Sequence, residues 1–97
     1  GIGDDGHTAS LFPGATDYTT SATVDVATHP TSGQTRLTLT APLIARSKHI
    51  SYLAVGAGKA AILRAIAEGG DYPAACIHAE NGNTEYHLDR LAADQLP

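Results

Sequence analysis

A histidine near the start of the chain has neighbours that could support acid–base chemistry. His7 follows Gly6, where a tight turn can project the imidazole into a cleft, and Asp5 lies two residues before it. Histidine suits the role of general base, because its unperturbed pKa of about 6.5 leaves the ring mostly neutral near pH 7. Asp5 could hold the imidazole in one tautomer, or it could accept backbone N–H bonds and only shape the turn. The residues leave both roles open.

Two basic residues are candidates for binding an anion such as a phosphate group. Lys59 lies in the first turn of a predicted helix that follows a strand and two glycines. Free N–H groups, the helix dipole and the ammonium group would converge there on an anion. Arg36, on a predicted strand, is the second candidate. The alternatives are a solvated helix lysine and a cross-strand or edge arginine.

Other reactive side chains carry weaker signals. Asp4, Asp5 and His7 lack a second His or Cys at ligand spacing, so no metal site is expected. Ser10 lacks the G-x-S-x-G turn of a serine hydrolase. Cys76 is the only cysteine, and we expect it to lie in a strand with its side chain in the hydrophobic core. No cofactor is expected.

The first six residues formally match the dinucleotide-binding pattern G-x-G-x-x-G. That fingerprint requires a long helix that opens at its third glycine and receives the pyrophosphate. Here Pro13-Gly14 ends the segment within two turns, and the adjacent Asp4 and Asp5 would repel phosphate. The sequence therefore argues against nucleotide binding.

The hydrophobic pattern predicts alternating strands and helices, and hence an α/β domain with a largely parallel sheet. The predicted strands are Thr23–Val26, Gln34–Thr40, His49–Val55, Ala74–Ile77 and Thr84–Leu88. The predicted helices are Leu43–Ser47, Lys59–Glu68 and Asp89–Leu96, the last capped by Asp89, with one helical turn at Thr8–Leu11.

Length and charge restrict the class of protein. The 97 residues suffice for one small domain, and the formal net charge of −4 comes without any run of basic residues. Nucleic acid and membrane surfaces usually require clustered Lys and Arg, so neither is an expected partner. The chain shows no secretory segment, and its single cysteine cannot form an intrachain disulfide, so we expect a cytoplasmic protein.

A longer motif begins at the same glycines. The stretch 1–14 reads GIGDDGHTASLFPG and resembles the 6-phosphogluconolactonase signature G-x-G-x-D-G-H-T-A-S-L-F-P-G. Downstream, Arg36–Pro42 resembles the family's R-[IL]-T-[LM]-T-x-P strand, and Val55–Ala60 resembles its strand followed by a G-x-x-K-A helix start. Leu88–Ala93 is similar to its l-D-x-x-A-A ending. The resemblance covers nearly the whole chain.

The resemblance implies a Rossmann-like fold whose largely parallel sheet is flanked by helices, with residues 1–97 forming only the C-terminal part of one longer domain. It implies hydrolysis of 6-phospho-D-glucono-1,5-lactone to 6-phospho-D-gluconate, with His7 activating water and Lys59 and Arg36 binding the phosphate. Backbone N–H groups of the substrate-binding candidates Gly1, Gly3 or Gly6 could hold the oxyanion, and the sequence does not distinguish among them. The expected partner is the N-terminal remainder of the parent chain, without which the fragment should be poorly active and marginally stable.

Related sugar-phosphate enzymes remain alternatives. The glucosamine-6-phosphate isomerases and deaminases share the G-x-G-x-D-G-H core, but a glutamate that assists their histidine stands where this chain has Phe12. Phenylalanine can neither accept a proton nor orient an imidazole, which favours the lactonase. A non-catalytic sugar-phosphate sensor on the same fold is the third hypothesis.

Overall fold

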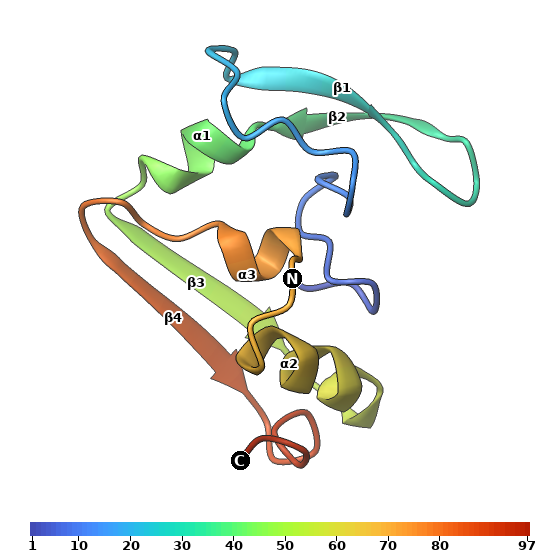
Figure 1. Cartoon of the computed structure of the whole chain (residues 1–97), viewed down its shortest axis with the longest axis vertical. Helices are drawn as coiled ribbons and strands as arrows, with labels where there is room; N and C mark the ends of the chain where they lie inside the picture. Colours follow the sequence, from blue (N-terminus) through green and yellow to red (C-terminus); the bar gives the residue numbers. More distant parts are fainter.

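The computed structural model describes residues 1–97, in which short strands and helices alternate (Figure 1). In chain order the elements are β1 (Val24–Thr28), β2 (Thr35–Leu39), α1 (Ala41–Ala45), β3 (His49–Ala54), a 3-10 turn (Ala57–Lys59), α2 (Ala60–Ala67), α3 (Pro73–Cys76) and β4 (Asn83–Leu88). None of the helices is long and apolar enough to cross a membrane.

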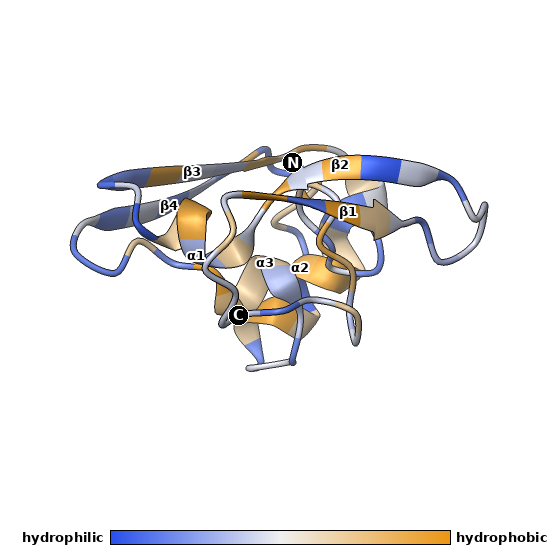
Figure 2. Cartoon of the chain, turned by 90° about the horizontal axis from the view of Figure 1, so that it is seen from above, coloured by the Kyte–Doolittle hydropathy of each residue, from blue (hydrophilic) through white to orange (hydrophobic).

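The strands form two separate pairs. β3 and β4 are parallel, with Ile50 opposite Thr84, and the chain passes between them through α2 and α3. β1 and β2 form an antiparallel hairpin in a second sheet. Figure 2 shows both strand pairs along one side of the molecule and α2 and α3 on the other. The α/β class is confirmed, with the parallel pair as its centre.

The core lies between β3 and the helices. Alternate residues of β3 are buried, as the period of a strand with one covered face requires. Tyr52 is the central one: its ring stacks on that of Tyr86 at 4.8 Å, and its hydroxyl donates to the Ile77 carbonyl over 2.7 Å. Burial raises the pKa of Tyr52, so the hydroxyl remains a donor. Ile62 and Leu63 of α2 complete this cluster.

The strand predicted at Ala74–Ile77 is wrong, because this segment forms helix α3. Tyr72 is extended, as residues before proline usually are, and Pro73 begins the single helical turn. The apolar run is too short for its period to separate a strand from a buried helix. Cys76 is exposed rather than in the core. Partial burial and the hydrogen bond to Asp71 raise the pKa of its thiol, which opposes thiolate formation.

Two predicted helical segments are also wrong. Residues 90–95 form successive turns, although Asp89 does cap the first of them by accepting the Ala92 N–H over 2.8 Å. So short a segment gains few helical hydrogen bonds after nucleation. The predicted helical turn at Thr8–Leu11 is a tight turn in which the Leu11 N–H donates to the Thr8 carbonyl and Ala9 has a φ of 50°.

The β1–β2 hairpin packs a polar face against the rest of the chain. Thr38 is buried and Arg36 half-buried on one face of β2, while Leu37 is exposed on the other. Because alternate residues of a strand share a face, Arg36 and Thr38 lie on the same side of β2. This is the side that contacts the N-terminal loop, since Thr38 Oγ accepts the Ser10 N–H over 3.1 Å.

Asp89 joins the ends of β3 and β4, which gives a prediction on stability. Its carboxylate accepts N–H bonds from Ala92 and Gly56, and these bonds hold the pKa of Asp89 below its ordinary value of 3.8. A carboxylate whose pKa is depressed in the folded state stabilises the fold at pH values above its unfolded-state pKa. This contribution disappears as the pH falls through the folded-state pKa.

We therefore expect Asp89→Ala to lower the melting temperature at about pH 7, and the difference from wild type to shrink below about pH 3.8. Thermal unfolding followed by circular dichroism at several pH values measures this. Asp94→Ala, which removes an exposed carboxylate without a side-chain hydrogen bond, is the matched control. A deficit that is constant across the acid range contradicts the prediction.

Candidate active site

Residues 1–8 form a closed loop held by its own backbone. The Gly3 N–H donates to the His7 carbonyl over 2.8 Å, and the Gly6 N–H donates to the Gly3 carbonyl over 2.9 Å. The Thr8 hydroxyl donates to the Gly1 carbonyl over 2.8 Å. These bonds use the N–H groups of Gly3 and Gly6, so the geometry does not support the oxyanion-donor role expected for them. Their contribution here is the shape of the loop.

This loop brings Asp5 and His7 together. Asp5 Oδ1 accepts the His7 backbone N–H over 3.0 Å and lies 2.5 Å from His7 Nδ1. Partial burial tends to raise the pKa of Asp5, but the hydrogen bonds and the charge of His7 outweigh it and leave this pKa below its ordinary value. Asp5 is therefore ionised near neutral pH and can only accept. In the neutral ring the proton thus lies on Nδ1, and Nε2 carries a free lone pair.

Gly3 makes this pair sterically possible. A Cβ atom on residue 3 would overlap the Nδ1 and Cε1 atoms of His7 and come within 2.9 Å of Asp5 Oδ1. Any side chain here would displace the imidazole or the carboxylate. The hydrogen bonds that the two roles considered for Asp5 require are both present, one to the imidazole and one to the backbone N–H of His7.

Phe12 supports the imidazole from one side. It is 3% exposed, its ring centroid lies 5.0 Å from that of His7, and the two planes are inclined by 48°. His29, from the β1–β2 hairpin, makes an edge contact with Phe12 at 5.3 Å. The position that carries an acid in the isomerase pattern is therefore an apolar wall here, and the acidic partner of His7 is Asp5.

The loop is anchored on α3 through Gly6. The Gly6 carbonyl accepts the Ala74 N–H over 3.0 Å, so the turn before His7 is fixed to a buried helix. Gly6 has a φ of 86°, and a Cβ here would lie 2.5 Å from the Tyr72 ring. Both the left-handed conformation and the close aromatic ring require glycine.

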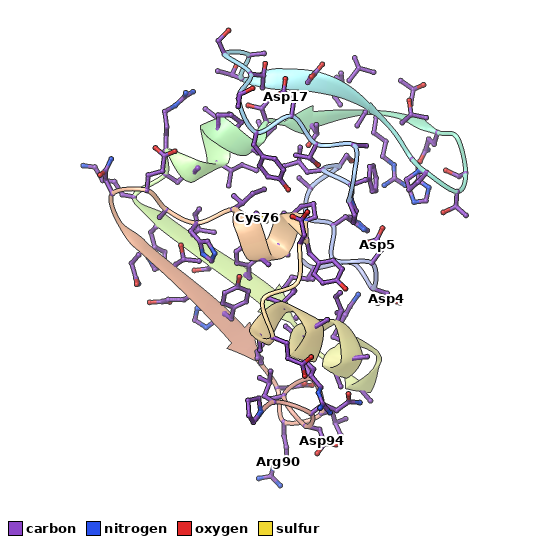
Figure 3. The ribbon with its side chains drawn as sticks, viewed as in Figure 1. Asp4, Asp5, Asp17, Cys76, Arg90 and Asp94 are labelled. Atoms are coloured by element: carbon purple, nitrogen blue, oxygen red, sulfur yellow. The ribbon has the colours of Figure 1, made fainter.

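Lys59 reaches the same loop from the other side. Its Nζ lies 2.8 Å from Asp4 Oδ1, and Figure 3 shows Asp4 and Asp5 next to each other on the loop. The backbone N–H groups of Ala57 and Gly58, in the turn that leads into α2, donate to no group of the chain. An ammonium group and two free N–H groups at the start of a helix form an arrangement that can bind an anion.

Arg36 takes no part in the interactions between Lys59 and the glycine loop. Its Nε donates to Gln34 Oε1 over 2.9 Å within the hairpin, and no hydrogen bond or ion pair joins it to the glycine loop or to Lys59. Its side of β2 nevertheless faces the loop through Thr38. No group of three or more His, Cys, Asp or Glu side chains is arranged to hold a metal ion.

The sequence predicts neither the ion pair between Asp4 and Lys59 nor the contact between Phe12 and His29. Asp4 and Lys59 are 55 positions apart in the chain. No local pattern reports a contact at that separation. The only indication in the sequence is indirect. A loop with two adjacent aspartates can take part in binding an anion only if a cation lies nearby.

Comparison with known proteins identifies the family. The family model described as glucosamine-6-phosphate isomerases/6-phosphogluconolactonase matches residues 1–86. The chain belongs to this family. The matched range contains the whole glycine loop, Lys59 and Arg36, so every candidate residue lies inside the family's common region.

Several relatives in the family are 6-phosphogluconolactonases. The protein of that name from Aggregatibacter actinomycetemcomitans is 50% identical over 100 residues, covering 99% of this chain and 43% of the relative. The one from Homo sapiens is 34% identical over 101 residues, covering 99% and 39%. The chain therefore spans about two fifths of the length of these relatives.

Solved structures of the same family share the fold. The crystal structure of the devB protein matches with a TM-score of 0.94 at 51% identity, covering 99% of this chain and 42% of that one. The 6-phosphogluconolactonase from Trypanosoma brucei matches with a TM-score of 0.82 at 28% identity, covering 99% and 40%. The Rossmann-like α/β class is thereby confirmed, and the chain corresponds to part of these longer folds.

The loop geometry predicts a specific effect of Gly3→Ala. The new methyl group must displace the imidazole, so the short hydrogen bond between Nδ1 and Asp5 should be lost. Proton NMR measures this as the disappearance of the strongly downfield Nδ1–H signal. Gly58→Ala is the matched control, because a Cβ there meets nothing within 4 Å and this signal should persist. An unchanged signal in Gly3→Ala is incompatible with the packing described here.

Proposed function

We propose that this chain is the C-terminal part of a single-domain 6-phosphogluconolactonase, which hydrolyses 6-phospho-D-glucono-1,5-lactone to 6-phospho-D-gluconate. The observation that carries the proposal is the Asp5–His7 pair, which leaves Nε2 as a free proton acceptor on a rigid loop. Membership of the family and the relatives named 6-phosphogluconolactonase support the choice of substrate.

In the proposed reaction His7 acts as a general base. Nε2 removes a proton from a water molecule while the water oxygen attacks the lactone carbonyl carbon. The resulting imidazolium is stabilised by the ionised Asp5, which remains a carboxylate throughout. When the ring C–O bond breaks, the imidazolium returns the proton to the departing ring oxygen. The products are one hydroxyl and one carboxyl group.

Lys59 is the proposed phosphate-binding residue. Its ammonium group contacts the glycine loop through Asp4, and the free N–H groups of Ala57 and Gly58 precede it at the start of α2. The phosphate is carried on the exocyclic C6 and takes no part in the bonds that change, so binding at Lys59 can orient the lactone toward His7. Arg36 remains part of the proposal as a second cation on the facing hairpin.

The proposal includes a longer polypeptide. Relatives are more than twice as long as this chain, and we propose that an N-terminal remainder packs against it and supplies further groups for the phosphate and the oxyanion. Gly1 would then be an ordinary residue of the loop, with a backbone N–H in place of an amino terminus. The 97 residues alone are proposed to be poorly active, and the whole protein to act in the cytoplasm without a cofactor.

The first test is the hydrolysis of the phosphorylated lactone by the full-length protein, measured against spontaneous hydrolysis. His7→Ala is expected to lower kcat by about two to four orders of magnitude, the usual effect of losing a general base. His49→Ala, an exposed histidine on the outer face of β3, should leave the rate unchanged.

Assays of the full-length protein also distinguish the lactonase from the two alternative functions. Ammonia release from glucosamine 6-phosphate would favour the isomerase or deaminase chemistry that the apolar Phe12 opposes. Ligand binding without turnover of either substrate would indicate a sensor. A wild-type rate equal to the background disproves the lactonase proposal.

A second test concerns the phosphate. Lys59→Ala should raise KM for the phosphorylated lactone about tenfold or more, because a charge-assisted contact is lost, and should leave KM for unphosphorylated glucono-1,5-lactone nearly unchanged. Steady-state kinetics with both substrates measures the difference. Lys48→Ala, an exposed lysine before β3, is the control. An equal change for both substrates argues against phosphate binding at Lys59.

A further inference from the structure

The ion pair between Asp4 and Lys59 is the one ion pair that connects the glycine loop to the rest of the chain. The Asp4 side chain is 80% exposed, while that of Lys59 is only 29% exposed. Ion pairs with such an exposed partner contribute little to stability. Of the two side chains, that of Asp4 is the one that can move into solvent with little loss of contacts.

The ammonium group in this pair is the one assigned above to the substrate's phosphate. A phosphate held by Lys59 and by the N–H groups of Ala57 and Gly58 would lie next to the Asp4 carboxylate. Two anions at this distance repel each other, and a single ammonium group cannot neutralise both. Phosphate binding must therefore displace Asp4 or share Lys59 with it.

We propose that the Asp4 carboxylate competes with the substrate's phosphate for Lys59 and thereby sets the affinity of the site for phosphorylated ligands. This inference rests on the function proposed for Lys59. In the free protein Asp4 occupies the ammonium group, and phosphate binding turns the Asp4 side chain into solvent. The product carries the same phosphate, so the return of Asp4 to Lys59 also assists product release.

The competition is tested in the full-length protein with Asp4→Asn, which removes the charge and keeps the size of the side chain. Both KM for the phosphorylated lactone and the inhibition constant of inorganic phosphate should fall about two- to fivefold at low ionic strength, the range of an exposed ion pair. The difference should decrease at high salt. KM for unphosphorylated glucono-1,5-lactone should not change.

Asp94→Asn is the matched control, since it removes the same charge from the C-terminal segment, where Figure 3 shows Asp94 well away from Asp4. In this variant KM for the phosphorylated lactone and the inhibition constant of inorganic phosphate should both remain at their wild-type values. A similar fall in Asp94→Asn would mean that the net charge of the protein is responsible, and would overturn the proposal.

A double variant makes the test specific to Lys59. In the Lys59→Ala background Asp4→Asn should have no further effect, and a gain in affinity that persists there overturns the competition. A KM for the phosphorylated lactone that is unchanged or raised in Asp4→Asn alone also overturns the competition.

The Lys59→Ala variant separates the competition from the function on which it rests. If Lys59→Ala itself leaves KM for the phosphorylated lactone unaltered, both the competition and the proposed phosphate role fail. A normal effect of Lys59→Ala with no effect of Asp4→Asn refutes the competition alone.

Discussion

The imidazole of His7 can lie against Asp5 only because residue 3 has no side chain. The ring occupies the volume that a Cβ atom on Gly3 would need, and the same loop is closed by the hydrogen bond from Gly3 to the His7 carbonyl. The glycine thus determines two things together, the course of the backbone and the position of the ring. The tautomer follows from the ionised Asp5, and the free lone pair on Nε2 follows from the tautomer.

The rest of the structure keeps this loop in place from three directions. Ala74 of α3 binds the Gly6 carbonyl, Thr38 of β2 binds the Ser10 N–H, and Lys59 before α2 pairs with Asp4. The helices are short, so little of this order comes from intrinsic helical stability. The site is a product of tertiary contacts between segments that are distant in the sequence. A general base must be held within a narrow range of positions. The hydrogen bonds at Gly6 and Ser10 restrict the loop whether or not Asp4 is paired with Lys59.

The parts of this arrangement that the sequence predicts are those encoded locally. Alternation of polar and apolar residues identifies β2, an apolar run identifies β3, and helical periodicity identifies α2. Asp5 and His7 are close enough in the chain for their pairing to be predicted. The strand predicted at residues 74–77 is wrong because four consecutive apolar residues cover barely more than one helical turn, too little to distinguish a helix from a strand. The turns after Asp89 were misassigned because the sequence provides a cap but too few residues to extend a helix. The Asp4–Lys59 pair and the Phe12–His29 contact depend on how distant segments pack, and no local pattern encodes that.

A carboxylate beside the proposed phosphate-binding lysine is consistent with efficient catalysis. In the proposed reaction the phosphate takes no part in the bond that breaks, so its contact with Lys59 would have nearly the same strength in the substrate complex and in the transition state. Such uniform binding lowers KM without raising kcat. On the proposed mechanism Asp4 weakens only this uniform contribution, whereas Asp5 acts where the charge changes, because it would stabilise the imidazolium that forms during the reaction. The two adjacent aspartates are thus proposed to act on different quantities: Asp4 on how tightly phosphorylated molecules are held, and Asp5 on how fast the held substrate reacts.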